Sequence, residues 1–378
     1  MNEKQPLREA FADHWYDTLG LNIRLFGPQQ AMKATIPHAF TRSTANGVEY
    51  AEVERIGLRL RDFRSWHEAW AVSAREKERC AAEAKAAGRL VTAREAYLAA
   101  AYLYHYAQLF VRPREADKLA SRRKSEFCYA NAAPYFDPPA QRVDIPYVDG
   151  PLAAYLRLPE GKRPLSAVIM VNGADSTKEE LHYWADYVVQ RGMAVLYFDG
   201  PGQGETAGVM TMPIEYERAV SAAMDYLCAR PEIESARIGV WGISTGGYLV
   251  ARSVAFEHRT RAAVSIGGFY DARKFPRWPY TTQENFCLMF GFVDRIGAMQ
   301  DFVRERISLS GLLQGVQCPF LIQHGVQDHL IDMEEIQQMA DEIGSSELVT
   351  YPDGDHALCN VHRQAGWQYA DWLAEQLR

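Results

Sequence analysis

Three residues that lie far apart in the sequence have the types and the order of a nucleophile, an acid and a base. Ser244 lies in the motif GISTG, Asp328 follows an apolar run, and His356 closes the motif DGDH. A histidine can take a serine proton as general base and return it to a leaving group, while a carboxylate fixes the imidazole tautomer and stabilises the imidazolium. The pattern predicts nucleophilic catalysis by Ser244, with Asp332 and Asp355 as nearby alternatives to the acid.

The residues around Ser244 are typical of a sharp turn from a strand into a helix. Residues 236–241 (ARIGVW) predict a short buried strand, and residues 247–258 (GYLVARSVAFEH) predict a helix. The glycines two positions before and after the serine suit a strained turn where a Cβ would clash with the neighbouring strand and helix. This is the nucleophile elbow of an α/β-hydrolase, a fold whose catalytic residues follow the order serine, acid, histidine.

Two backbone amides are candidates for an oxyanion hole, which needs N–H donors aimed at the negative oxygen of a tetrahedral intermediate. Thr245, directly after the nucleophile, supplies one donor, and Ala174 in the turn VNGAD is expected to supply the other. The following STKEE, residues 176–180, has capping-box spacing and predicts helix caps. Residues 199–204 (DGPGQG) lack the spacing of a phosphate-binding loop and predict a tight loop beside the site. His324 and His329 are interpreted as supporting residues, and His362 as part of the last helix.

The elements that must position these residues begin after about residue 140. Residues 141–378 predict an α/β-hydrolase catalytic domain in which an antiparallel strand pair opens an eight-stranded, mostly parallel sheet covered by helices. Residues 270–313 break the rhythm of strands and helices and predict a lid-like insertion. The expected strands are Val143–Val148, Ala153–Leu158, Ala167–Val171, Ala194–Phe198, Ile238–Trp241, Ala262–Ile266, Phe320–Gln323 and Leu348–Tyr351.

The first 140 residues predict an all-helical N-terminal cap domain. Ala51–Ala87 has apolar residues every three or four positions up to Gly88, which favours a helix hairpin. Thr92–Val111 is apolar almost all round, so this helix should be packed on several sides until Pro113 ends it.

Composition excludes several classes of function. The 378 residues carry a net charge of -7 and no long basic cluster, so nucleic acid is not expected as a partner. No apolar run is long enough to span a membrane and no signal peptide is evident, which predicts a cytoplasmic protein. The six scattered cysteines, without a Cys-x-x-Cys pair, are expected to be reduced and to bind no metal. No cofactor is expected.

Several motifs together carry a family resemblance: NGADSTKEE at residues 172–180, FDGPGQGE at residues 198–205, the elbow with a second glycine, GGF at residues 267–269, and the segments around Asp328 and His356. The chain resembles the 2,6-dihydroxypseudooxynicotine hydrolase group, which is similar to fungal chain-shortening hydrolases of naphthopyrone synthesis and, more distantly, to the fermentation-respiration switch protein. Thr245 departs from the larger apolar residue expected after the nucleophile.

The resemblance implies hydrolysis of a carbon–carbon bond next to a ketone, on a small β-diketone, aryl ketone or polyketide-like substrate. It also implies an acid that assists the substrate, for which Asp271 is the candidate with Tyr270 beside it, and a homodimer through the helical domain. Two alternatives stay open: an esterase, acyltransferase or cyclase that uses the same triad, and a partner-binding protein with a relic hydrolase domain.

Overall fold

The structure, a computed structural model, describes residues 18–112, 116–293 and 295–378. The chain divides into two compact units: Met1–Ala132 with Pro279–Thr281, and Ala133–Trp278 with Thr282–Arg378. The main division therefore falls between residues 132 and 133, not at 140, because η1 (Ala133–Tyr135) packs against the first strand. Within the part of the chain that the structure describes, no helix is long and apolar enough to cross a membrane.

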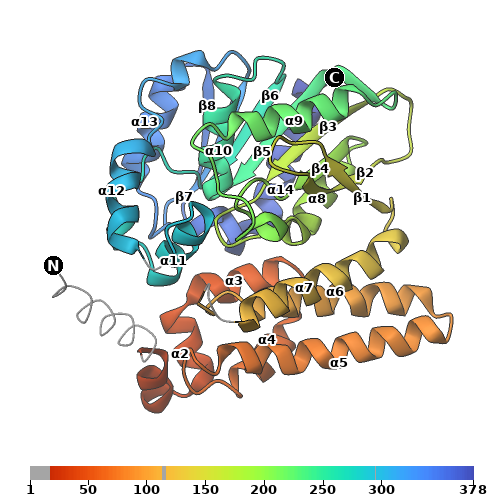
Figure 1. Ribbon diagram of the computed structural model, residues 1–378, viewed down its shortest axis with the longest axis vertical. Helices are drawn as coiled ribbons and strands as arrows, with labels where there is room; N and C mark the ends of the chain where they lie inside the picture. The colour runs from red at the N-terminus through yellow and green to blue at the C-terminus, as the bar shows by residue number, and fades with distance from the viewer. Residues whose placement is uncertain (1–17, 113–115, 294) are drawn as a thin grey trace. The chain divides into compact units, whose positions relative to one another are not determined.

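The first unit is helical. Its longest helices, α5, α6 and α7, lie side by side (Figure 1). The turn between α5 and α6 contains Gly88, whose φ of 72° is the left-handed conformation that glycine adopts without strain. Trp66 and Trp70 are buried on α5, and the Trp66 indole donates a hydrogen bond to the carbonyl of Tyr106 on α6, 2.8 Å away. The described residues 18–26 are helical, and after them come α2 (Pro28–Thr35), α3 (Pro37–Ala45), α4 (Tyr50–Gly57), α5 (Trp66–Ala86), α6 (Leu90–Ala107) and α7 (Ala116–Ala132).

The structure gives the bounds of the predicted helical segments. Segment Ala51–Ala87 contains two helices, α4 and α5, and between them Ser65 Oγ accepts hydrogen bonds from the amides of Arg61 and Asp62. A short polar side chain can bond to backbone amides that would otherwise form the hydrogen bonds of a helix. Helix α6 ends at Ala107, earlier than predicted, and Pro113 lies outside the described residues.

The second unit contains the predicted eight-stranded sheet, in the order β1-β2-β4-β3-β5-β6-β7-β8. Strand β2 runs antiparallel to β1 and β4, and all other neighbours are parallel. The α/β-hydrolase prediction is confirmed, although the first strand begins earlier than expected and the fifth is longer. The strands are β1 (Ala140–Ile145), β2 (Leu152–Arg157), β3 (Leu165–Val171), β4 (Ala194–Phe198), β5 (Ile233–Ile243), β6 (Ala262–Ile266), β7 (Phe320–Gly325) and β8 (Ser346–Tyr351).

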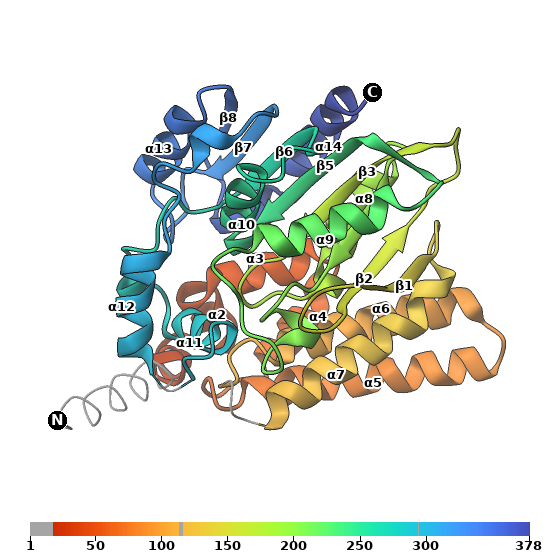
Figure 2. The same cartoon turned by 45° about the horizontal axis from the view of Figure 1, so that its top comes forward.

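Helices cover both faces of this sheet, as Figure 2 shows. Alternate residues of a strand point to opposite faces of the sheet. On β5, Val240 packs in the hydrophobic core on the face covered by α9 and α10, and Trp241 packs on the other face against α8 and α14. The Trp241 ring lies 5.5 Å from both Trp184 and Tyr369, measured between ring centroids. The helices are α8 (His182–Val189), α9 (Glu217–Cys228), α10 (Thr245–Val254), α13 (Met333–Ile343) and α14 (His362–Gln376).

The predicted insertion at 270–313 leaves the sheet after β6 and returns before β7. It contains η4 (Phe275–Arg277), α11 (Tyr280–Met289) and α12 (Ile296–Arg306), and it ends where η5 (Leu313–Gly315) begins. Its two ends are joined by backbone hydrogen bonds from Ala272 to Ile307 and from Leu309 to Tyr270, of 3.1 and 2.9 Å. The segment therefore leaves the sheet and returns to it at neighbouring points. Its role as a lid stays a prediction.

Candidate active site

Ser244 occupies the sharp turn between β5 and α10. Its φ of 55° and ψ of -124° are strained for a residue with a side chain. A Cβ on Gly242 would lie 2.2 Å from the Gly246 carbonyl oxygen, and one on Gly246 would lie 2.3 Å from the Val171 oxygen. Both glycines are therefore required by the close approach of β3, β5 and α10. The local sequence builds an elbow that holds the Ser244 hydroxyl at the carboxyl end of the sheet.

The structure brings Ser244, Asp328 and His356 into one chain of hydrogen bonds. The Ser244 Oγ lies 2.9 Å from His356 Nε2, and His356 Nδ1 lies 2.7 Å from Asp328 Oδ2. These residues follow β5, β7 and β8, whose carboxyl ends meet at one edge of the sheet. With Nδ1–H donated to the carboxylate, the Nε2 lone pair faces the serine hydroxyl, an arrangement that can take up its proton.

The other oxygen of Asp328 is occupied by the backbone. Asp328 Oδ1 accepts hydrogen bonds from the amides of Leu330 and Ile331, at 2.8 and 3.1 Å. Burial raises the pKa of Asp328, but the His356 charge and hydrogen bond, with these further contacts, lower it overall. The carboxyl is therefore ionised at neutral pH and can orient His356.

His356 combines burial with an excess of negative charge around it. Burial lowers its pKa, but the charge and hydrogen bond of Asp328, with the charges of Asp355 and Asp175, raise it overall above 6.5. His324 differs: it is fully buried, 3.9 Å from Asp328 Oδ2, and burial lowers its pKa. The two histidines thus have opposite protonation tendencies, and His324 is a neutral neighbour of the acid.

The turn after His356 is also strained. Ala357 and Leu358 have φ of 60° and 59°, in the left-handed region that costs roughly 1–2 kcal/mol per residue. Asn360 holds the turn: its Nδ2 donates to the Asp353 carbonyl at 2.6 Å, and its Oδ1 accepts from the Asp355 amide at 2.9 Å. His356 therefore projects from a loop whose backbone is fixed on both sides.

Thr245 follows Ser244 directly, and the turn that contains Ala174 comes close to Ser244 at Gly173. Thr245 is the first residue of α10, and the turn of Ala174 passes the nucleophile so closely that a Cβ on Gly173 would lie 3.4 Å from Ser244 Cβ. The loop at residues 199–204 contacts this turn, because Gln203 Nε2 donates to the Asn172 carbonyl at 2.9 Å. This loop stands beside the site as predicted.

The candidate substrate residues Tyr270 and Asp271 bond elsewhere. Asp271 accepts hydrogen bonds from the amide and the Nε of Arg273, at 2.9 and 2.6 Å. The Tyr270 hydroxyl donates to Glu342 on α13, 2.6 Å away. The contacts found among the described residues do not join either side chain to the triad, so their role in binding substrate stays a prediction. Asp175, whose charge acts on His356, was a residue that the sequence pattern did not single out.

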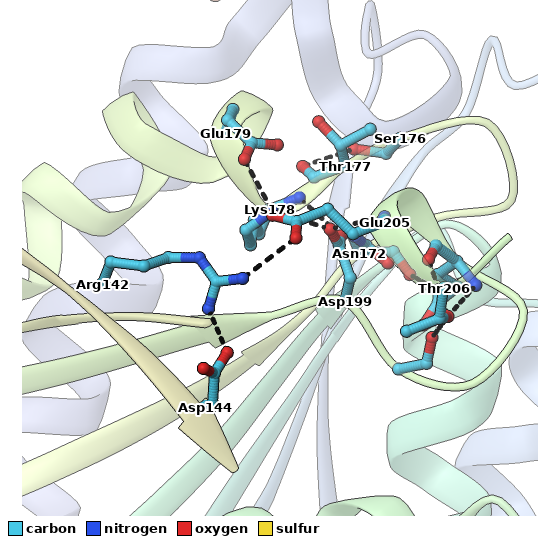
Figure 3. A network of polar contacts seen from close by, with 12 residues as sticks. Arg142, Asp144, Asn172, Ser176, Thr177, Lys178, Glu179, Asp199, Glu205 and Thr206 are labelled. Atoms are coloured by element: carbon cyan, nitrogen blue, oxygen red, sulfur yellow. Dashed lines mark hydrogen bonds and ion pairs between the residues drawn. The ribbon is translucent and has the colours of Figure 1, made fainter. Parts of the chain in front are cut away.

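A buried ion network that sequence reasoning missed surrounds Lys178 and contacts the turn at Asn172 (Figure 3). The Lys178 ammonium is fully buried and lies 2.6 Å from Glu179, 3.0 Å from Asp199 and 2.5 Å from Glu205. Burial lowers the pKa of Lys178, but these carboxylates raise it well above its usual value. Arg142 extends the network outward to Glu205, 2.9 Å away.

The capping-box prediction for residues 176–180 is wrong. Thr177 precedes η2 (Lys178–Leu181), which has no side-chain cap. Ser176 Oγ instead donates to Glu180, and Glu179 pairs with Lys178. A buried ammonium attracts a carboxylate more strongly than does an unpaired backbone amide at the start of a helix. In the loop after β4, the Gln203 backbone amide donates to Thr206 Oγ1 at 3.2 Å, a contact that the sequence analysis did not predict.

Replacing Lys178 by methionine is expected to lower the free energy of unfolding by about 3–5 kcal/mol, since it leaves buried carboxylates unpaired. Urea unfolding followed by circular dichroism measures the change. Arg79→Met is the matched control: Arg79 pairs with Glu83 on the surface, with side chains 68% and 60% exposed, and should lose less than about 1 kcal/mol. Equal losses in the two variants would show that the Lys178 network contributes no special stability.

Comparisons with known proteins show which families this chain matches. The model of the FrsA-like esterases matches residues 7–272, and that of the prolyl oligopeptidase family matches residues 180–378. A 2,6-dihydropseudooxynicotine hydrolase from Paenarthrobacter nicotinovorans is 34% identical over 340 residues, which is 89% of this chain and 91% of the relative. The hydrolyase poxO from Penicillium oxalicum is 36% identical over 57% of this chain and 55% of its own length.

A solved structure extends the likeness to three dimensions. The crystal structure of 2,6-dihydroxy-pseudo-oxynicotine hydrolase superposes with a TM-score of 0.82 at 32% identity, covering 89% of this chain and 95% of that one. The predicted resemblance is confirmed, and the chain is a hydrolase; the alternative of a non-enzymatic partner-binding protein is wrong. The chain belongs to the FrsA-like esterase family, and its C-terminal half also matches the prolyl oligopeptidase family.

Proposed function

We propose that this hydrolase uses Ser244, His356 and Asp328 to cleave a carbon–carbon bond next to a ketone through an acyl-serine intermediate. The observation that carries the proposal is the continuous contact from Ser244 Oγ to His356 and on to Asp328, at 2.9 and 2.7 Å. The likeness to a 2,6-dihydropseudooxynicotine hydrolase over 89% of the chain supports the reaction type. The proposed substrates are small β-diketones, aryl ketones or polyketide-like ketones.

The proposed reaction begins when Ser244 Oγ adds to the ketone carbon and its proton passes to His356 Nε2. The carbonyl oxygen becomes an oxyanion, for which the amides of Ala174 and Thr245 are the proposed donors. Collapse re-forms the carbonyl and breaks the adjacent carbon–carbon bond, whose electron pair leaves on carbon and takes the proton from His356. Water, deprotonated by His356, then hydrolyses the acyl-serine and releases a carboxylic acid. One water is consumed overall.

The leaving carbanion limits which ketones can react. An alkyl carbanion is a very poor leaving group, so the electron pair must be delocalised into a second carbonyl or an electron-poor ring. This requirement selects β-diketones and activated aryl ketones over simple ketones. Ester hydrolysis by the same triad is the second candidate, favoured by the esterase description of the matching family model; acyl transfer and cyclisation remain variants of it.

The experiment is to incubate the protein with matched β-diketones, aryl ketones and esters in oxygen-18 water and to identify products by mass spectrometry. Carbon–carbon cleavage yields a carboxylic acid with one labelled oxygen and a shortened ketone or arene. Turnover of the esters alone would replace the proposal by the esterase alternative, and a cyclic product without label would identify a cyclase. A fluorophosphonate should label Ser244 in every one of these cases.

The acidic limb of the activity profile is expected above pH 6.5, because only neutral His356 acts as base and its pKa is raised. Lower pH protonates the imidazole, so kcat/KM should fall about tenfold per pH unit below that limb. Asp175→Asn removes a negative charge that favours the imidazolium, so the limb should move to lower pH. Steady-state rates between pH 5 and 9 measure both profiles. A limb below 6.5 in the wild type, or an upward shift in the variant, would contradict the role of His356.

Two further properties belong to the proposal. A reducing compartment such as the cytoplasm is proposed from the sequence, in which the six cysteines are scattered without a Cys-x-x-Cys pair. Dimerisation through the helical unit is proposed from the family resemblance, and light scattering after size-exclusion chromatography tests it.

A further inference from the structure

The turn that carries Ala174 is held from behind by one side chain, that of Gln203. Gln203 follows β4 and is 1% exposed. Its Nε2 donates to the carbonyl oxygens of Asn172 and Gly173, at 2.9 and 3.4 Å. A single amide group therefore contacts two successive carbonyls of the turn that passes Ser244.

The second contact matters because of peptide geometry. The Gly173 carbonyl and the Ala174 N–H belong to the same peptide unit, which is planar and trans. In a trans unit the C=O and N–H bonds point in opposite directions. Whatever holds the Gly173 oxygen therefore sets the direction of the Ala174 N–H. Gln203 holds that oxygen on the side away from the proposed oxyanion.

The orientation of the Gln203 amide is itself set by Tyr216. The Tyr216 hydroxyl donates to Gln203 Oε1 at 2.6 Å, so the NH₂ group must face the two carbonyls. Tyr216 is fully buried, and burial raises its pKa well above 10, which keeps the phenol protonated as a donor. Gly200 leaves room for this contact, since a Cβ there would lie 2.1 Å from the Tyr216 hydroxyl.

The buried ion network anchors the start of the same turn. Asn172 Nδ2 donates to Asp199 Oδ1 at 2.8 Å, and the Lys178 amide donates to the same oxygen at 2.8 Å. The Asp199 carboxylate is held in turn by the Lys178 ammonium at 3.0 Å. The side chain of Asn172 is thus held by Asp199, which is itself paired with Lys178 (Figure 3). The Asn172 carbonyl is held by Gln203.

From these contacts we infer that Gln203 is a positioning residue of the oxyanion hole, acting through the Gly173–Ala174 peptide, and that Tyr216 fixes its amide. The inference rests on the proposed function, because it presumes that Ala174 donates to an oxyanion. Gln203 touches no reacting atom. Its effect should fall on transition-state binding and leave substrate binding and the pKa of His356 unchanged.

The test compares Gln203→Met with Gln323→Met. Gln323 is an equally buried glutamine of the same unit, with Nε2 2.9 Å from the Tyr351 hydroxyl. The measurements are the second-order rate of Ser244 labelling by a fluorophosphonate, whose phosphoryl oxygen takes the oxyanion position, together with kcat, KM and the pH profile. Removing one oxyanion donor lowers kcat of an enzyme by about 10²–10³-fold. A donor that keeps its N–H but points in the wrong direction should lower kcat by about 10- to 100-fold.

For Gln203→Met we expect the labelling rate and kcat to fall by about 10- to 100-fold. KM and the acidic limb of the pH profile should stay unchanged. For Gln323→Met both rates should stay within about threefold of wild type. Tyr216→Phe, which deletes one oxygen, should lower both rates about tenfold and decides the matter if Gln203→Met does not fold. Labelling of Gln203→Met or Tyr216→Phe at the wild-type rate would overturn the inference alone. A wild-type protein that reacts with no fluorophosphonate would instead overturn the proposed function.

Discussion

Ser244→Ala is expected to lower kcat/KM by about 10⁵-fold or more and to abolish fluorophosphonate labelling, since no other group can form the acyl intermediate. The Ser244 hydroxyl is held 2.9 Å from the proposed base, His356, on a strained turn. Removing the hydroxyl leaves the fold intact, because alanine keeps the Cβ. Rates with the best ketone or ester substrate and labelling followed by mass spectrometry measure both effects.

Ser253→Ala provides the matched control for this variant. Ser253 lies on the same helix, α10, is fully buried, and donates to the Leu249 carbonyl at 2.6 Å. Its loss should change kcat/KM by less than about threefold. A Ser244→Ala protein that keeps a tenth of the wild-type activity would show that the reaction does not pass through this serine.

Asp328→Asn is expected to lower kcat by about 10⁴-fold. The Oδ1 that accepts the Leu330 and Ile331 amides can be kept by asparagine, so the loop should hold its shape. The amide NH₂ would then replace Oδ2, which now accepts from His356 Nδ1 at 2.7 Å. Since two donors cannot face each other, the imidazole must adopt the other tautomer, in which Nε2 carries the proton and cannot act as a base.

The competing carboxylates serve as controls for Asp328. Asp332 bonds to Lys274 at the surface, so Asp332→Asn should change kcat less than about threefold. Asp355→Asn should chiefly move the acidic limb to lower pH, because the Asp355 charge favours the His356 imidazolium. Steady-state kinetics of the three variants decides the assignment, and a larger loss in either neighbour than in Asp328→Asn would reassign the acid.

The parts of the site that were predictable from sequence depend on local constraints. Apolar runs bounded by turns identify strands, and Gly242 and Gly246 have no substitute where β3, β5 and α10 meet. Ser244, Asp328 and His356 could be chosen because each follows a strand, and neighbouring parallel strands end at one edge of the sheet. The position of the turn between α4 and α5 was not predictable from periodicity alone, because Ser65 bonds there to nearby amides.

The support beneath the site could not be predicted, because it joins segments that are distant in sequence. Gln203 and Lys178 meet the same turn only because β3 and β4 are neighbours in the sheet, which places their loops together. The local pattern at Ser176 predicted a helix cap, but the buried charge of Lys178 reorganised the carboxylates around it. Likewise, the positive φ angles of Ala357 and Leu358 could not be predicted, because neither residue is a glycine.

The proposed base, His356, comes from the loop after β8, so it is the last of the three proposed catalytic residues to be made as the chain grows from its N-terminus. A chain that does not yet extend to residue 356 lacks the imidazole that contacts Ser244 Oγ in the folded protein. Labelling of Ser244 by a fluorophosphonate is therefore expected only after β8 has joined the sheet and His356 is in place. Labelling of Ser244 is consequently a reporter of completed folding as well as of catalysis.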